Sequence, residues 1–213
     1  MCRENNDPIR INYYKKVKFL GLTIYNYLSW NFHIEETIPK LNEACFVIIT
    51  VRSYLSYEIV RKIYFSHFHS IMSYGIIFWG SSSENNSVFK TQTRTIRVIV
   101  NSSSGTFSNE LFKELQILIL HCQCIYSLTM FVTNNRQLFK SNSDDHNLST
   151  RYNSDLHLPT ANLTIFFYLG IIMYNHLPQS LKELSHSVRW FRLTMNRIFF
   201  KKSLLFIGGI SSL

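Results

Sequence analysis

Residues 16–48 have the sequence KVKFLGLTIYNYLSWNFHIEETIPKLNEACFVI, and the hydrophobic period changes within this stretch. In its first part, and in the residues before it, side chains alternate with a period of two, which is typical of β-strands. The alternating positions are Ile9, Ile11 and Tyr13, followed by Val17, Phe19 and Gly21. We therefore predict two short strands within residues 9–24, joined by a turn at Tyr14-Lys15-Lys16.

From about Phe32 the apolar residues take the spacing of a helix. They are separated by four, three, four and three positions, which places them on one helix face. These residues are Ile34, Ile38, Leu41, Cys45 and Ile48. Pro39 lies inside the pattern, and we expect it to kink the helix or to restart its first turn.

Further helices are predicted along the rest of the chain. One begins after Ser56 as its N-cap and ends at Gly80. Its inward face is predicted to consist of Ile59, Ile63, His67, Ile71, Tyr74 and Phe78. The other predicted helical or apolar segments are 86–100, with Phe89, Ile96 and Ile99 inward, then 108–115, 118–133, 163–175 and 187–201. Residues 141–155 are rich in Ser, Asn and Asp and predict an exposed loop.

These patterns predict a mainly α-helical protein. An N-terminal β-hairpin is followed by a helical bundle and, near the C-terminus, by an amphipathic helix. The predicted units are the hairpin within residues 1–28, a helical domain at 29–135, a polar linker at 136–160 and a C-terminal helical extension at 161–213.

The composition indicates a polyanionic partner. The 213 residues include 22 Lys and Arg against 13 Asp and Glu, which gives a net charge of +9. Nucleic acid is favoured over a membrane, because no apolar run approaches the roughly 20 residues that span a bilayer. Residues 1–16 lack the apolar core of a secretory signal, and the four cysteines form no C-x-x-C motif. We expect an intracellular protein, in cytoplasm or nucleus, with reduced thiols.

Basic residues form two rows with helical spacing. Lys90, Arg94 and Arg97 are four and three positions apart, and Arg189 and Arg192 are three apart. Such rows contact phosphates along a nucleic acid without reading its sequence. Solvated helix faces commonly have the same pattern, which remains an alternative interpretation. We predict that these five residues contact phosphates.

No catalytic or metal-binding pattern is found in the sequence. Nucleotidyl transfer needs carboxylates that hold two Mg²⁺ ions. The aspartates are Asp7, Asp144, Asp145 and Asp155. His67 and His69 are two positions apart, so they diverge on a helix. We predict no catalytic residue, no metal site and no cofactor in this chain.

The segment Lys18-Phe19-Leu20-Gly21-Leu22 is the first of several motifs, and Leu28-Ser29-Trp30-Asn31-Phe32-His33-Ile34 is the second. The later motifs, in order, are the segment from Tyr64 to Gly75, Trp79-Gly80, Arg94-Thr95-Ile96-Arg97, Leu156-His157-Leu158-Pro159 and Tyr174-Asn175-His176-Leu177-Pro178. In this order and spacing they resemble the hairpin-to-thumb region of non-LTR retrotransposon reverse transcriptases, especially those of jockey-type elements.

This resemblance implies that Lys18, Phe19, Leu20 and Gly21 belong to the primer grip, a hairpin that holds the primer 3′ end. It implies a role in an RNA-directed DNA polymerase that binds an RNA/DNA template–primer duplex and, when intact, uses Mg²⁺. In that family the catalytic aspartates precede the hairpin, whereas Asp144-Asp145 follows it in a polar segment. We therefore expect a fragment without palm and fingers, inactive alone, whose partners are the duplex and the palm and fingers of a full-length copy.

Three other interpretations remain open. The chain is a helical protein-interaction module, a membrane-surface protein that uses its basic C-terminal helix, or a transposon remnant without function. Salt-sensitive binding to an RNA–DNA hybrid would favour a nucleic-acid role over the first two interpretations.

Overall fold

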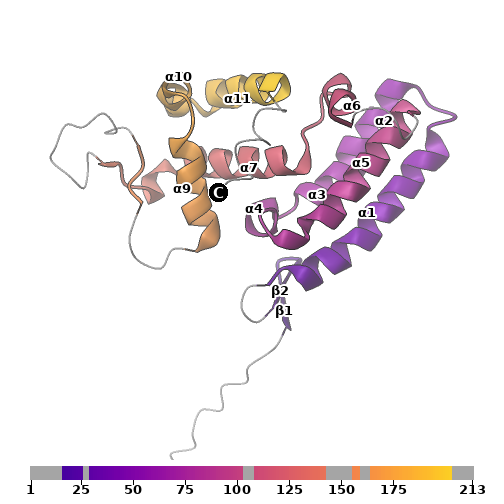
Figure 1. Cartoon of the computed structure of the whole chain (residues 1–213), viewed down its shortest axis with the longest axis horizontal. Coiled ribbons are helices and arrows are strands. Elements are labelled where there is room, and N and C mark those ends of the chain that lie inside the picture. The colour runs from indigo at the N-terminus through magenta and orange to yellow at the C-terminus, as the bar shows by residue number, and fades with distance from the viewer. Residues whose placement is uncertain (1–15, 26–28, 103–107, 143–154, 159–163, 203–213) are drawn as a thin grey trace, which may run out of the picture.

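The computed structural model describes residues 16–25, 29–102, 108–142, 155–158 and 164–202. These residues form a mainly helical protein that begins with a two-stranded antiparallel hairpin, which confirms the predicted fold class (Figure 1). In Figure 1 the hairpin lies at one end of a group of helices that includes α1 and α5. A second group, which includes α7, α9 and α11, lies beside it.

The hairpin turns at Leu20 and Gly21. Strand β1 (Lys16–Phe19) pairs with β2 (Leu22–Tyr25), with Phe19 opposite Leu22. The two loop residues have φ angles of +46° and +77°, and positive φ at both positions is the type I′ pattern that suits the twist of paired strands. The predicted turn at 14–16 is therefore wrong at Lys16, which begins β1. The alternation misplaced Gly21 in a strand, although its left-handed conformation makes it a turn residue. Residues 9–13 lie outside the described part.

Helix α1 (Asn31–Val51) follows the predicted apolar spacing. The buried residues on it are His33, Ile34, Thr37, Leu41, Ala44, Cys45 and Ile48, and Ile38 packs against the core from its edge. The helix continues through Pro39, which is exposed, so the expected restart of the first turn is wrong.

The segment predicted as one helix from 57 to 80 is divided. It contains α2 (Tyr57–Ile63), a π-helical segment (Tyr64–His69), α3 (Ser70–Ser73) and α4 (Ile76–Trp79). Gly75, with φ of +61°, separates α3 from α4, and a Cβ there would lie 2.6 Å from the Leu22 side chain of the hairpin.

The inward face predicted for this segment is displaced by one position, and Ile63, Ile71 and Phe78 pack only against the edge of the core. Ile59 and Tyr74 are exposed, and the buried residues are Val60, Tyr64, Phe68, Met72, Ile76 and Trp79. Each of the first five lies four positions after the one before it. On an α-helix this spacing rotates the side-chain direction by about 40° per step. The wider π-helical turns between Tyr64 and His69 reduce this drift and keep the series facing the core.

Helices α1 and α5 (Asn86–Val100) pack together and run parallel. A 3₁₀ turn (Ser83–Asn85) brings the start of α5 against α1. At the other end, the Arg52 guanidinium donates hydrogen bonds to the carbonyl oxygen of Val98, at 2.8 Å, and to Asn101 Oδ1, at 2.7 Å. Both helices therefore begin at the end of the molecule that carries the hairpin (Figure 1).

The second group of helices is centred on α7 (Leu120–Asn134), which follows α6 (Ser108–Glu114). Helix α9 (Ile165–Asn175) and helix α11 (Val188–Lys202) pack against α7, and α4 packs against α7 and α9 (Figure 1). The remaining elements are 3₁₀ turns at Arg136–Leu138 and Glu183–His186, and the short helix α10 (Gln179–Lys182). One continuous core of buried apolar residues extends through both groups.

Candidate nucleic-acid interface

The hairpin is attached to α1 by polar contacts. The Thr23 hydroxyl donates to Glu36 Oε2 at 2.7 Å, and Lys16 Nζ donates to Glu36 Oε1 at 2.5 Å. The Thr23 amide lies 3.4 Å from His33 Nδ1. These contacts hold β2 against the first turns of α1, so the hairpin has a fixed base.

Glu36 is ionised over the ordinary pH range. Hydrogen bonds from Lys16 and then from Thr23 hold the pKa of the Glu36 carboxyl at about 2. A charged Glu36 neutralises Lys16. Lys18 is exposed and forms no ion pair with any described carboxylate, although its charge also helps to lower the pKa of Glu36.

The tip of the hairpin is exposed and apolar. Phe19 is 61% exposed and Leu20 is 72% exposed, and Lys18 and Gly21 are exposed beside them. The Tyr74 hydroxyl donates a hydrogen bond to the carbonyl oxygen of Leu20, so the loop is also held from the segment between α3 and α4. Of the four residues predicted for the primer grip, Lys18 and Phe19 end strand β1 and point to opposite faces of the hairpin, and Leu20 and Gly21 form its turn.

The basic row on α5 is only partly accessible. Lys90 and Arg94 are exposed, whereas Arg97 is half-buried and its Nε is buried without a hydrogen-bond partner. Among the described residues, none of the three forms an ion pair. Because α5 begins at the hairpin end, Lys90 lies nearest to the hairpin along the helix, and Arg97 lies about 10 Å further along it.

The basic row on α11 lies apart from the hairpin. Arg189 and Arg192 are exposed on a helix that packs against α7 and α10, and Figure 1 places this helix away from β1 and β2. The structure thus brings the hairpin tip and the start of the α5 row to one end of the molecule. It does not bring the α11 row beside them.

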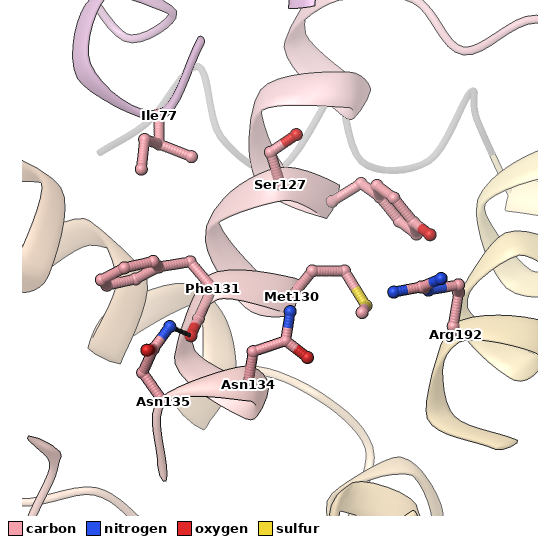
Figure 2. A pocket seen from close by; sticks show the side chains of 8 residues that line it. Ile77, Ser127, Met130, Phe131, Asn134, Asn135 and Arg192 are labelled. Carbon is pink, nitrogen blue, oxygen red and sulfur yellow. Dashed lines mark hydrogen bonds between the residues drawn. The ribbon is translucent and has the colours of Figure 1, made fainter. Parts of the chain in front are cut away.

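Arg192 lines an open pocket of about 450 Å³ between α7 and α11 (Figure 2). The other lining residues are Ile77, Tyr126, Ser127, Met130, Phe131, Asn134 and Asn135. In Figure 2 the Arg192 side chain extends toward Met130. Arg192 therefore lies on the side of α11 that faces α7.

Two of the sequence motifs meet in a structural cluster. The Asn175 side chain accepts a hydrogen bond from the Leu156 amide at 2.8 Å and donates one to the Leu156 carbonyl at 2.9 Å. Lys182 Nζ donates to Asp155 Oδ1 and to the Asn175 carbonyl oxygen, both at 2.6 Å. The Lys182 and Asp155 side chains are 8% and 16% exposed, so this cluster ties residues 155–158 to α9 and α10 rather than facing a ligand.

Burial favours the neutral forms of several titratable groups. Burial lowers the pKa of His33, His69 and His121. It raises the pKa of the Cys122 thiol to about 11 and that of Cys124 to about 12. In the described part of the chain, no group of three His, Cys, Asp or Glu side chains is arranged to hold a metal ion. Asp7, Asp144 and Asp145 lie outside it.

No family model, curated protein or solved structure matches this chain. Among the described residues, no helix has both the length and the apolar character needed to cross a membrane.

Two exposed residues of α11 were not predicted as contacts from the sequence. Trp190 is 60% exposed, and Arg197 is exposed seven positions later. With Leu193 between them, they have the spacing of one helix face, a signal that was present in the sequence.

Proposed function

We propose that this chain is a non-catalytic, thumb-like unit of the non-LTR reverse transcriptase lineage, and that it binds an RNA/DNA template–primer duplex without reading its sequence. The observation that carries the proposal is the hairpin tip. Its exposed Phe19 and Leu20, beside the exposed Lys18, stand at the end of the molecule where the α5 basic row begins.

The side chains at the hairpin end of the molecule can contact the end of a nucleic-acid duplex. Lys90 and Arg94 offer positive charge with no ion pair to a described carboxylate, and Lys18 adds an exposed charge near Glu36, which favours phosphates. Phe19 and Leu20 offer apolar surface for a sugar or a terminal base. Leaving such residues exposed is unfavourable in a free protein, and a bound partner removes that cost. The ordered motifs from Lys18 to Pro178 support the lineage.

Polymerase activity is not part of the proposal for this chain alone. The reaction needs carboxylates that hold two metal ions. The only described aspartate, Asp155, is paired with Lys182 in the cluster that holds α9 and α10.

Fluorescence anisotropy with a labelled RNA–DNA hybrid across a salt series tests the proposal. We expect log Kd to rise with log salt, by about 0.7 to 0.9 for each phosphate contact. Lys90→Ala with Arg94→Ala should weaken binding and lower this slope by up to about 2. The matched control is Lys62→Ala with Lys113→Ala, which removes the same charge from exposed positions on α2 and α6.

A duplex interface at the hairpin end requires the two double variants to differ. Equal losses in both would mean that the hybrid responds only to net charge, and would contradict an interface at this end. Absence of hybrid binding at low salt, by a chain with a helical circular dichroism spectrum, would contradict the proposal altogether.

A further inference from the structure

The outer face of α11 has no role in the duplex-binding proposal. We define it by four exposed residues, Arg189, Trp190, Leu193 and Arg197. Opposite them, Phe191, Met195 and Phe199 are fully buried and attach the helix to the core. One side of the helix is therefore packed against the core, and the outer face on the other side is exposed to solvent.

The exposed ring of Trp190 is the central feature of this face. The side chain is 60% exposed, and no described aromatic ring or cation packs on it. Tryptophan carries a large apolar surface, which is normally buried or covered by a partner. Arg189 and Arg197 lie within one or two helical turns of the ring, so positive charge lies on both sides of it along the helix.

The charge of the helix limits the class of partner. Residues 188–202 contain no Asp or Glu, and Arg189 and Arg197 form no ion pair with a described carboxylate. A polyanion complements such a face. A flat aromatic ring between arginines is the arrangement by which proteins stack unpaired bases while holding the adjoining phosphates.

We propose that the outer face of α11 binds single-stranded nucleic acid, with Trp190 stacked on an unpaired base and with Arg189 and Arg197 on the flanking phosphates. The inference rests on the proposed nucleic-acid function and adds a second surface with a different ligand. In a duplex the bases stack on one another and are closed to the ring, so this surface selects unpaired strands.

A membrane surface is the less favoured occupant. Interfacial helices bury their most apolar face in lipid. In α11 that face is taken by the core, and only Trp190 and Leu193 are apolar on the outer face.

Binding of a fluorescein-labelled single-stranded oligouridylate of about 12 nucleotides, a length typical of single-strand sites, tests the inference. We expect Trp190→Ala to weaken this binding by about 5- to 150-fold, the range measured for one stacked base. Trp190→Phe keeps a ring and should stay within about threefold of the parent. The control is Tyr54→Ala, which removes an exposed aromatic ring, 84% exposed, between α1 and α2.

Tryptophan fluorescence supplies a second readout. Trp79 is 1% exposed and Trp30 is half-buried, so Trp190 is the tryptophan that solution ligands reach most readily. Unlabelled oligouridylate should quench the emission of the parent protein and leave that of Trp190→Phe unchanged. A parent protein that binds the strand without quenching would overturn the stacking.

The RNA–DNA hybrid separates this inference from the proposed function. Trp190→Ala should leave hybrid affinity within about threefold of the parent, because no unpaired base is offered. If the strand binds and quenches while the hybrid does not bind, the duplex proposal fails and this inference stands. If Trp190→Ala loses affinity equally for the single strand and for the hybrid, the single-strand inference is overturned. Trp190-dependent sedimentation with phosphatidylserine vesicles by a protein that does not bind the oligonucleotide would also overturn it.

Discussion

At the scale of single residues, Leu20 has a backbone conformation that its side chain does not favour. Its φ of +46° lies in the left-handed region, which costs a residue with a Cβ about 1–2 kcal/mol. Asparagine occupies this position of type I′ turns far more often. Strained residues are commonly kept where their side chains have a function, and Leu20 is 72% exposed at the proposed interface.

Replacement of Leu20 should therefore separate stability from binding. We expect Leu20→Asn to raise the free energy of unfolding by about 0.5–1 kcal/mol, and to weaken hybrid binding. Gly21→Ala should lower the free energy of unfolding by about 1 kcal/mol, because φ at Gly21 is +77°. Denaturant unfolding and anisotropy measure the two effects. A Leu20→Asn protein that is less stable, or that binds the hybrid unchanged, would contradict this account of the turn.

Lys182 and Asp155 form a largely buried ion pair whose single replacement should be costly. Lys182→Met leaves the Asp155 carboxylate without its cation and removes a hydrogen bond to Asn175, so we expect a loss of about 3 kcal/mol in unfolding free energy. Lys182→Met combined with Asp155→Leu should recover much of this loss, because no charge is then left buried. Additive losses in the double variant would show that the pair is not coupled.

At the scale of elements, α5 and α7 are joined by the fully buried Gln92 side chain. Its Nε2 donates to the Leu118 carbonyl at 2.9 Å and to the Tyr64 hydroxyl at 3.1 Å. Its Oε1 accepts the Leu120 amide at 2.9 Å. One amide therefore connects the π-helical segment, α5 and the first residue of α7.

We expect Gln92→Leu to lower the free energy of unfolding by about 2–4 kcal/mol, because the Leu118 carbonyl and Leu120 amide lose their partner in the core. Tyr64→Phe removes only the hydroxyl and should cost less than about 1.5 kcal/mol. Thermal and urea unfolding of the two variants give the comparison. Similar losses in both would mean that the network around Gln92 adds little beyond packing.

The elements differ in how well the sequence predicted them. Helix α5 was predicted at its observed limits, 86–100, because polar Asn and Ser residues border a regular helical pattern at both ends. The inward face of 57–79 was displaced by one position from its start, where Val60 and not Ile59 is buried, because two neighbouring β-branched apolar residues fit the same spacing equally well. Gln92 and Lys182 were not predicted as buried, since their partners are backbone and carboxylate groups distant in sequence.

The residues predicted as nucleic-acid contacts also differ in how exposed they are. Lys18, Phe19 and Leu20 were predicted as contacts and are exposed, but Arg97 is half-buried. Trp190 was overlooked because an aromatic residue in an amphipathic helix is usually part of the core, and here Phe191 takes that position. Spacing determines which residues share a face, while the packing partners determine which face is buried.

At the scale of the whole molecule, burial of thiols predicts a pH dependence of stability. Unfolded thiols ionise near the ordinary pKa of 9.0, whereas burial raises the pKa of Cys122 to about 11 and of Cys124 to about 12. A raised folded-state pKa gives stability that is present below pH 9 and is lost as pH rises through the folded value. The free energy of unfolding should therefore fall between about pH 9 and pH 12.

Urea unfolding across this range measures the slope. We expect Cys122→Ala with Cys124→Ala to be less stable at neutral pH but to have a shallower slope above pH 9. Tyr57, Tyr64 and Tyr126, whose pKa burial also raises, contribute to the slope that remains. An identical slope in parent and variant would contradict burial of the two thiols.

The arrangement of the whole molecule also determines which lysines a bound duplex covers. The hairpin and the start of α5 lie at one end, while α2 and α6 carry the exposed Lys62 and Lys113 elsewhere on the first helical group. Lysine acetylation followed by mass spectrometry measures the accessibility of each amine separately in one sample.

Acetylation with and without a saturating RNA–DNA hybrid tests the central claim most directly. The account predicts that the hybrid slows modification of Lys18 and Lys90, and that it leaves the rates at Lys62 and Lys113 unchanged. Equal protection of all four lysines, or protection of Lys62 and Lys113 alone, would contradict a nucleic-acid interface at the hairpin end of the molecule.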